Sequence, residues 1–195
     1  MAASGGFHKP HLSHGVGSPP KDSFDPEYYL AVKTGIIKWS VAKSVEFKIK
    51  QQVRSGIIPY SKNTGSLIFA MGVDATDGML TDFGGWVKYK LDENAVTAAI
   101  REFKEETCES FPPIEDKIND SLVVYHRKEA IFFINIDFDQ QEVVKTFTEK
   151  LPKEPEVVTI KWLNLDDLKH ALDNDEVYSP CANLLSVLNS IVTLL

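Results

Sequence analysis

The sequence predicts an α/β domain, and three observations carry that prediction. Residues 66–73 read SLIFAMGV, a short apolar run of the length and composition typical of a buried strand. Residues 122–126 and 130–138 are two further apolar runs with a short polar link, which predicts a β-hairpin. Residues 93–106 carry apolar side chains on one side of a helical wheel and acidic side chains on the other, the pattern of an amphipathic helix. Strands and helices that follow one another in this way are typical of the α/β class.

Three segments are expected along the chain. Residues 1–24 are rich in Gly, Ser, Pro and His and hold few core-forming side chains, so we expect a disordered tail. Residues 25–51 mix basic and aromatic side chains, including Trp39, and predict an ordered N-terminal extension joined to the domain. Residues 52–195 are expected to form the domain proper.

Turns and helix breakers divide the domain into its other elements. Asp77-Gly78 predicts a turn, and Pro112-Pro113 breaks the chain after the acidic helix. In chain order, the remaining elements are a first strand at 53–60, a segment at 79–83 that leads into Gly84-Gly85, a helix or loop at 140–150, a strand at 157–163, a helix that begins at Leu165, and an apolar helix at 181–195 packed on the core.

Composition bounds the class of protein. A chain of 195 residues with 43% hydrophobic and 25% charged residues is typical of one globular domain with a sizeable core. The formal net charge of −7 argues against a uniformly basic nucleic-acid binder. Cys108 and Cys181 lack the spacing of metal ligands and predict a reducing compartment, cytoplasmic or otherwise intracellular. We expect no secretory leader, because the N-terminal residues carry no apolar h-region. We expect no membrane partner, because the apolar run 181–195 is too short to cross a bilayer.

The acidic side of the predicted helix is the strongest candidate for chemistry. At about 100° per residue, Glu102, Glu105 and Glu106 fall within an arc of roughly 100° on its surface. Three carboxylates on one stripe repel each other unless a cation lies among them. A hard divalent cation such as Mg²⁺ prefers oxygen ligands of this kind and keeps further positions for water or substrate phosphates. A solvated helix face rich in Glu and Lys is the ordinary alternative.

The other side of this helix is expected to pack on the core. Val96, Ile100 and Phe103 cluster about 130° from the carboxylates. Asp92 is the expected N-cap of the helix. Short side chains flank the acidic stripe and are expected to let a bulky phosphate group approach; they are Ala95, Ala98 and Ala99.

Together with the glycines that precede it, this helix resembles the signature of the Nudix hydrolase superfamily. The signature runs Gly, five residues, Glu, seven residues, Arg-Glu-hydrophobic-any-Glu-Glu, any residue, Gly and a hydrophobic residue. Glu93, seven residues and then 101–106 (REFKEE) match that spacing after Gly84-Gly85, and the resemblance covers about residues 52–172. It implies an α/β/α sandwich with a mixed sheet. It also implies Mg²⁺- or Mn²⁺-dependent cleavage of a nucleoside diphosphate linked to another group.

The resemblance implies a role for each matching residue. The metal ligands would be the three helix carboxylates, Glu102, Glu105 and Glu106, and turnover is expected to depend on Glu105. Arg101 would orient these carboxylates through charge-assisted hydrogen bonds, with Glu93 as its partner. Gly84 and Gly85 would let the backbone come close to the site and turn sharply into the following loop. The metal would neutralise charge on the bridging oxygens and lower the pKa of its bound water.

Two positions depart from the signature. Seven residues separate Gly85 from Glu93 instead of five, so loop 86–92 carries a two-residue insertion. We expect this insertion to reshape the loop and to leave the helix carboxylates in place. Cys108 stands where the signature has Gly, and Glu109 stands where it has a hydrophobic residue. Because Gly is favoured at helix ends for its positive φ, Cys108 is expected to affect how the helix stops and not the ligand set.

Two segments outside the helix are expected to contact substrate. Nudix proteins often use a further acid as base or ligand, which tends to precede a strand that carries a Trp. Glu156, just before the strand at 157–163, is the candidate here, and Glu154 is its alternative. In the inserted loop, Lys88 and Lys90 flank an aromatic residue; the cations would contact phosphates while the ring stacks on a base. A solvated loop is the ordinary alternative for both segments.

The leading substrate hypothesis is capped RNA. Seven Lys or Arg residues and one acid lie between Lys33 and Lys62, an asymmetry that suits an anionic ligand. Residues 55–60 and 81–85 resemble Nudix proteins of large DNA viruses, some of which are similar to mRNA-decapping enzymes. The alternatives are dinucleoside polyphosphates, nucleotide sugars or diphosphoinositol phosphates as substrates, and a non-catalytic Nudix-fold module that binds nucleotide or RNA.

Overall fold

The computed structural model describes residues 7–8, 28–32, 35–49, 52–62, 65–126 and 128–195. The strands are β1 (Phe7–His8), β2 (Tyr28–Val32), β3 (Gly35–Val41), β4 (Arg54–Ser61), β5 (Ile68–Asp74), β6 (Leu80–Thr81), β7 (Phe83–Trp86), β8 (Leu122–Tyr125), β9 (Glu129–Asn135) and β10 (Val157–Asn164). The helices are α1 (Ala42–Ile49), α2 (Ala95–Glu106), α3 (Gln140–Lys150), α4 (Leu165–Asp173), α5 (Ser179–Leu185) and α6 (Leu188–Ile191), with a 3₁₀ turn at Ile118–Asp120.

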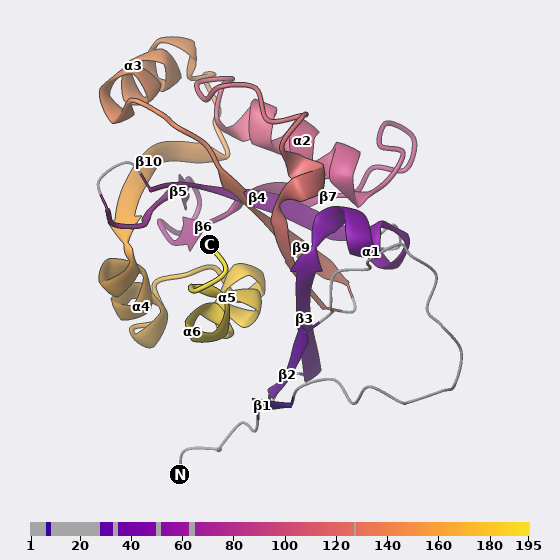
Figure 1. Cartoon of the computed structure of the whole chain (residues 1–195). Helices are drawn as coiled ribbons and strands as arrows, with labels where there is room; N and C mark the ends of the chain where they lie inside the picture. Colours follow the sequence, from indigo (N-terminus) through magenta and orange to yellow (C-terminus); the bar gives the residue numbers. More distant parts are fainter. Residues whose placement is uncertain (1–6, 9–27, 33–34, 50–51, 63–64, 127) are drawn as a thin grey trace, which may run out of the picture.

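One mixed sheet is the centre of the fold (Figure 1). Its strand order is β1-β2-β3-β8-β9-β4-β5-β10, with β6 paired to β5 and β7 paired to β4. β4 and β9 run parallel, whereas the other described pairs are antiparallel. Every residue of β4 is buried, and β9 is buried between its end residues. Their apolar sequences fit this central place, because a strand covered on both faces needs apolar side chains on both.

Helices cover both faces of the sheet and make an α/β/α sandwich. On one face, α1, α2 and α3 bury Val45, Phe103 and Phe147 against the strands. On the other face, α4 and α5 bury Leu168 and Leu184, and α6 packs in the same cluster. Figure 1 shows the two groups of helices on opposite sides of the strands. The predicted α/β architecture with a mixed sheet is confirmed.

The C-terminal apolar run differs from its prediction. Instead of one helix it forms two short ones, α5 and α6, which both bury their apolar side chains in the core. Ser186 lies at the break, and its hydroxyl donates to the carbonyl oxygen of Asn183 at 2.7 Å, a local bond that competes with helix continuation. Among the described residues, no helix is long and apolar enough to span a membrane.

The N-terminal extension continues the sheet of the domain. β3 pairs with β8 from Lys38–Tyr125 to Val41–Leu122. The Trp39 side chain is 1% exposed and belongs to the core on the α4–α6 face. Trp39 is therefore a core residue and is not available to stack on a base. Phe7–His8 form β1 and pair with β2, although they lie in the segment expected to be disordered; the other residues of 1–24 lie outside the described ranges.

Truncating Trp39 is expected to show that the extension and the domain share one core. Trp39→Ala should lower the free energy of unfolding by about 3–5 kcal/mol, because it opens a cavity among buried side chains. The matched control is Ile36→Ala on the same strand, where the side chain is 53% exposed and the loss should stay below about 1 kcal/mol. Urea denaturation measures both; equal losses would contradict the shared core.

Candidate metal and phosphate site

The acidic helix α2 begins at Ala95, with Asn94 as its N-cap. The Asn94 side chain accepts hydrogen bonds from the backbone N–H groups of Val96 and Thr97. The Thr97 hydroxyl in turn accepts a hydrogen bond from the Asn94 N–H at 3.0 Å. This reciprocal capping box satisfies the first backbone donors of the helix. The prediction that Asp92 caps the helix is wrong, and Asp92 forms an ion pair instead.

The helix ends in the left-handed conformation, which glycine adopts more readily than other residues. Thr107 is the C-cap, and Cys108 and Glu109 follow with φ values of 53° and 51°. This conformation costs a residue with a Cβ roughly 1–2 kcal/mol, so these two positions hold local strain. The backbone N–H of Thr107 still donates to the Phe103 carbonyl at 3.0 Å. The helical turns that carry the carboxylates are therefore regular, as expected.

Small residues let α2 approach the sheet closely. The Ser55 hydroxyl on β4 donates to the Ala95 carbonyl oxygen at 2.6 Å. The alanines expected to leave room for phosphate lie fully buried at this contact; they are Ala95, Ala98 and Ala99. Their small size brings the helix to the strands and does not open a path for phosphate, contrary to the prediction.

On the sheet side of this contact, Gly84 and Gly85 of β7 leave room for the carboxylates of α2. A Cβ on Gly85 would lie 2.6 Å from the carboxyl carbon of Glu102. The Gly84 N–H donates to Glu106 Oε2 at 2.8 Å. Both glycines lie within a regular strand, and neither is among the described residues with positive φ. They bring the backbone close to the carboxylates, as predicted, but they make no sharp turn.

The carboxylates of α2 meet the expected additional acids in one cavity. A cavity of about 170 Å³ lies between α2 and the segment 152–157. Its lining includes five acidic residues: Glu102, Glu105, Glu106, Glu154 and Glu156. The Ala75 N–H donates to the Glu156 carbonyl oxygen at 2.8 Å, which ties this part of the segment to the end of β5. Residues far apart in the sequence are thus brought together at one site.

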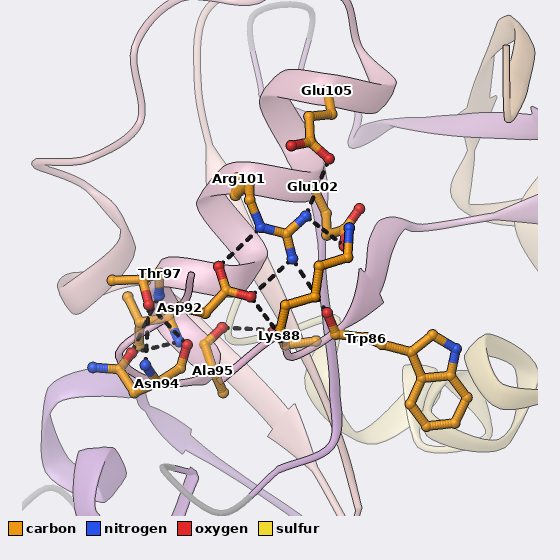
Figure 2. A network of polar contacts seen from close by, with 11 residues as sticks. Trp86, Lys88, Asp92, Asn94, Ala95, Thr97, Arg101, Glu102 and Glu105 are labelled. Atoms are coloured by element: carbon orange, nitrogen blue, oxygen red, sulfur yellow. Dashed lines mark hydrogen bonds and ion pairs between the residues drawn. The ribbon is translucent and has the colours of Figure 1, made fainter. Parts of the chain in front are cut away.

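Arg101 connects the helix carboxylates to the loop before the helix (Figure 2). Its Nε and Nη2 donate to the two Asp92 oxygens at 2.9 and 2.8 Å. Its Nη1 donates to Glu102 Oε1 at 2.7 Å and to Glu105 Oε2 at 3.1 Å. The predicted role of Arg101 in orienting carboxylates is consistent with this geometry. The predicted partner is not, because Asp92 takes the place expected for Glu93, whose side chain is exposed.

Of the two loop lysines, Lys88 reaches the carboxylates. Its Nζ lies 3.8 Å from Glu102 Oε1, and its backbone N–H donates to Asp92 Oδ2 at 2.7 Å. The Lys88 side chain is half exposed, so a cation stands between the carboxylates and solvent. Lys90 is exposed and makes no ion pair with any described residue. Lys88 is thus the better placed of the two predicted phosphate contacts.

A buried ion pair behind the site was not foreseen. Arg54 donates to both Asp82 oxygens at 2.8 and 2.9 Å, and also to the Gly84 carbonyl at 3.1 Å. Burial opposes the charge of Arg54, but the adjacent Asp82 carboxylate raises the pKa of its guanidinium above the usual value. Arg54 therefore holds β7 through its hydrogen bond to the Gly84 carbonyl oxygen. Its side chain is buried, so it does not belong to a basic surface that RNA could contact. An Arg and an Asp 28 positions apart gave no sequence signal of this pairing.

The charge balance at Glu106 indicates whether a metal fits. Burial raises the pKa of the Glu106 carboxyl to about 9, with further upward contributions from Asp82 and Glu102. A carboxyl in this position needs a proton or a cation. Across the described ranges, no three His, Cys, Asp or Glu side chains converge into a preformed metal site. Arg101 accounts for this in part, because it draws Glu102 and Glu105 toward itself. The possible donors are carboxylate oxygens, which are the ligand type that Mg²⁺ and Mn²⁺ prefer.

Comparisons with known proteins give weak similarities only. No protein-family model matches the chain, and no curated protein matches it. Among solved structures, a binary complex of a C. elegans Ap4A hydrolase is 22% identical, covering 73% of this chain and 99% of that chain, with a TM-score of 0.46. The Nudix domain of Shewanella oneidensis NrtR, complexed with ADP ribose, is 14% identical, covering 62% of this chain and 77% of that chain, with a TM-score of 0.43. Similarities at this level assign neither a family nor an activity to the chain.

Neutralising Asp92 is expected to destabilise the protein. The hydrogen bond from Arg101 lowers the pKa of the Asp92 carboxyl, so the folded state favours its charged form. Asp92→Asn should cost about 1.5–3 kcal/mol at pH 7, the usual range for a hydrogen bond to a charged group.

The pH dependence and a neighbouring residue supply the controls. Because the pKa of Asp92 is depressed in the fold, its contribution is present above the unfolded value of 3.8 and is lost as pH falls through the folded value. Urea titrations should therefore show the wild-type advantage shrinking below about pH 4. Glu93→Gln should change stability by less than about 0.5 kcal/mol at pH 7. A larger loss of stability in Glu93→Gln than in Asp92→Asn would show that Glu93 is the partner of Arg101, as expected from the sequence.

Proposed function

We propose that this protein is a divalent-metal-dependent pyrophosphohydrolase that acts on a nucleoside diphosphate linked to another group. The observation that carries the proposal is the single cavity lined by three α2 carboxylates and by Glu154 and Glu156. The Lys88 cation stands 3.8 Å from Glu102 at the same carboxylates. Negative ligands for a metal and a cation for phosphate are the two requirements for cleaving a phosphoanhydride. The resemblance of 84–106 to the Nudix signature supports the same reaction class.

The residues of the chain supply defined functions in this reaction. Glu102, Glu105 and Glu106 would hold Mg²⁺ or Mn²⁺, which when bound neutralises phosphate charge and acidifies a coordinated water. Arg101 donates to the Glu102 carboxylate and would keep it oriented, and Lys88, close to the same carboxylate, would bind a phosphate oxygen. Glu156 would take the proton as the water oxygen forms its bond to phosphorus. The bridging P–O bond then breaks, and the two phosphate products leave.

The substrate class is best tested as a panel. Capped RNA remains our first candidate from the sequence, but two of the seven cations that suggested an RNA track are engaged elsewhere. Arg54 is buried with Asp82, and Lys43 pairs with Asp120 at 2.8 Å. Dinucleoside polyphosphates, nucleotide sugars and diphosphoinositol phosphates are therefore compared with capped RNA, each with Mg²⁺ and with Mn²⁺. Absence of metal-dependent product release from all of them would refute the enzyme proposal and leave a non-catalytic binding module.

Neutralising Glu105 is expected to abolish turnover without unfolding the protein. Glu105 is exposed, so Glu105→Gln should cost little stability. Loss of a metal ligand should lower kcat/KM by at least about 100-fold on whichever substrate is cleaved. Glu109→Gln, an exposed acid just after the helix and outside the cavity lining, serves as the matched control and should keep the parent rate. Parent-like activity of Glu105→Gln would show that the ligand assignment is mistaken.

Neutralising Glu156 tests the source of the general base. Glu156→Gln should lower kcat by about 100-fold or more, the usual contribution of a general base, while KM changes little. The acid limb of the pH–rate profile should disappear with it. Glu154→Gln should have the smaller effect, because the backbone tie to Ala75 holds Glu156. The reverse order of the two variants would move the base to Glu154.

A further inference from the structure

The loop that follows β7 presents an exposed tryptophan on a fixed backbone. The Trp86 side chain is 68% exposed. Its carbonyl oxygen accepts a hydrogen bond from Arg101 Nη2 at 3.2 Å, and the next residue, Val87, donates from its N–H to the Val53 carbonyl at 2.9 Å. Trp86 also pairs with Arg54 in the β4–β7 register. The backbone is thus held on several sides while the ring is free.

The exposure of this ring is not explained by folding. Trp39 is 1% exposed, and Trp162 is partly buried against Phe111 and Phe138. The Trp86 indole makes no hydrogen bond and no ring contact with any residue in the described ranges. An exposed indole on a fixed backbone offers a flat π-face on which a planar group can stack.

The position of Trp86 relates it to the proposed phosphate site. Gly84 and Gly85 contact Glu106 and Glu102, and Trp86 is the next residue of the same strand. At about 3.3 Å per residue, its Cα lies about 7 Å along the strand from Gly84, within the span of a nucleotide. Figure 2 shows the indole projecting from the end of β7, away from Arg101 and the carboxylates it holds. The indole face is thus open to solvent at the end of the strand whose glycines contact the carboxylates.

We propose that Trp86 is the platform on which the nucleobase of the substrate stacks, with the phosphates lying beside Lys88 and the α2 carboxylates. This inference rests on the proposed function and specifies its substrate as one that carries a planar base. Stacking on an indole tolerates every base, because each has a π-face, so Trp86 favours nucleotides over base-free phosphates. Tyr89 in the same loop is also exposed, and its hydroxyl donates to the Gln52 carbonyl oxygen at 3.1 Å.

The test compares two ligands that share a diphosphate mimic and differ in the base. Guanosine 5′-(α,β-methylene)diphosphate and methylenediphosphonate both resist hydrolysis at the bridging position. Their dissociation constants are measured by calorimetry with the full-length protein in MgCl₂. The wild type should bind the guanosine compound about 10-fold or more tightly than methylenediphosphonate, the size expected for one base–aromatic stack. Quenching of tryptophan emission by the guanosine compound should be lost in Trp86→Phe.

The variants separate stacking from damage to the loop. Trp86→Ala should remove the preference for the guanosine compound, and Trp86→Phe should keep part of it. Leu91→Ala is the matched control, since Leu91 is a 73% exposed apolar residue of the same loop without a π-face, and it should keep the whole preference. A wild type without preference, a Trp86→Ala protein that keeps it, or a Leu91→Ala protein that loses it would each overturn the stacking assignment.

The outcome is distinguishable from failure of the proposed function. If a substrate of the panel is hydrolysed and Trp86→Ala keeps the preference for the guanosine compound, the stacking proposal is rejected and the enzyme proposal stands. If the preference depends on Trp86 but no substrate is hydrolysed, the enzyme proposal is rejected and a nucleotide-binding site remains. Failure of both ligands to bind the wild type removes the stacking platform, and the substrate panel alone then decides the enzyme proposal.

Discussion

The close contact between α2 and the strands β4 and β7 is the constraint on which the site depends. Alanines on the helix and glycines on the strand leave almost no side-chain volume between the two backbones. The Glu102 carboxyl then occupies the space that a side chain at Gly85 would need. The Gly84 N–H reaches Glu106 directly. Any larger residue at these positions would push the helix outward and move its carboxylates away from the strand.

This contact also sets the electrostatics. Carboxylates held against backbone lose solvation, which is why burial raises the pKa of Glu106. Arg101 compensates from the outer side through Asp92, Glu102 and Glu105, and Arg54 lies behind β7 with Asp82. The site therefore has its cations at the edges and its carboxylates in the middle. The ion pairs of Arg101 fix where the Glu102 and Glu105 carboxylates lie.

Much of the fold was predictable because it rests on local patterns. The apolar run at 66–73, the two apolar runs of the hairpin at 122–138 and the amphipathic acidic helix are each recognisable from residues close together in the sequence. Cys108 signalled a left-handed helix end because its place in the pattern belongs to glycine, and its φ is 53°. The misassigned cap shows the limit of such rules. Asp and Asn are both favoured N-cap residue types. The ion pair with Arg101 engages Asp92, and Asn94 caps the helix.

The sequence by itself determined which functional groups are available: an acidic stripe at helical spacing, a glycine pair before it and a lysine in the loop between them. Their types and spacings are local, so they can be interpreted without coordinates. Tertiary structure alone decided that Arg54 is buried with Asp82, and that Trp39 lies in the core while Trp86 remains outside. These facts depend on strand order and on which face each strand presents, and long-range pairing of the chain leaves no periodic trace in the sequence.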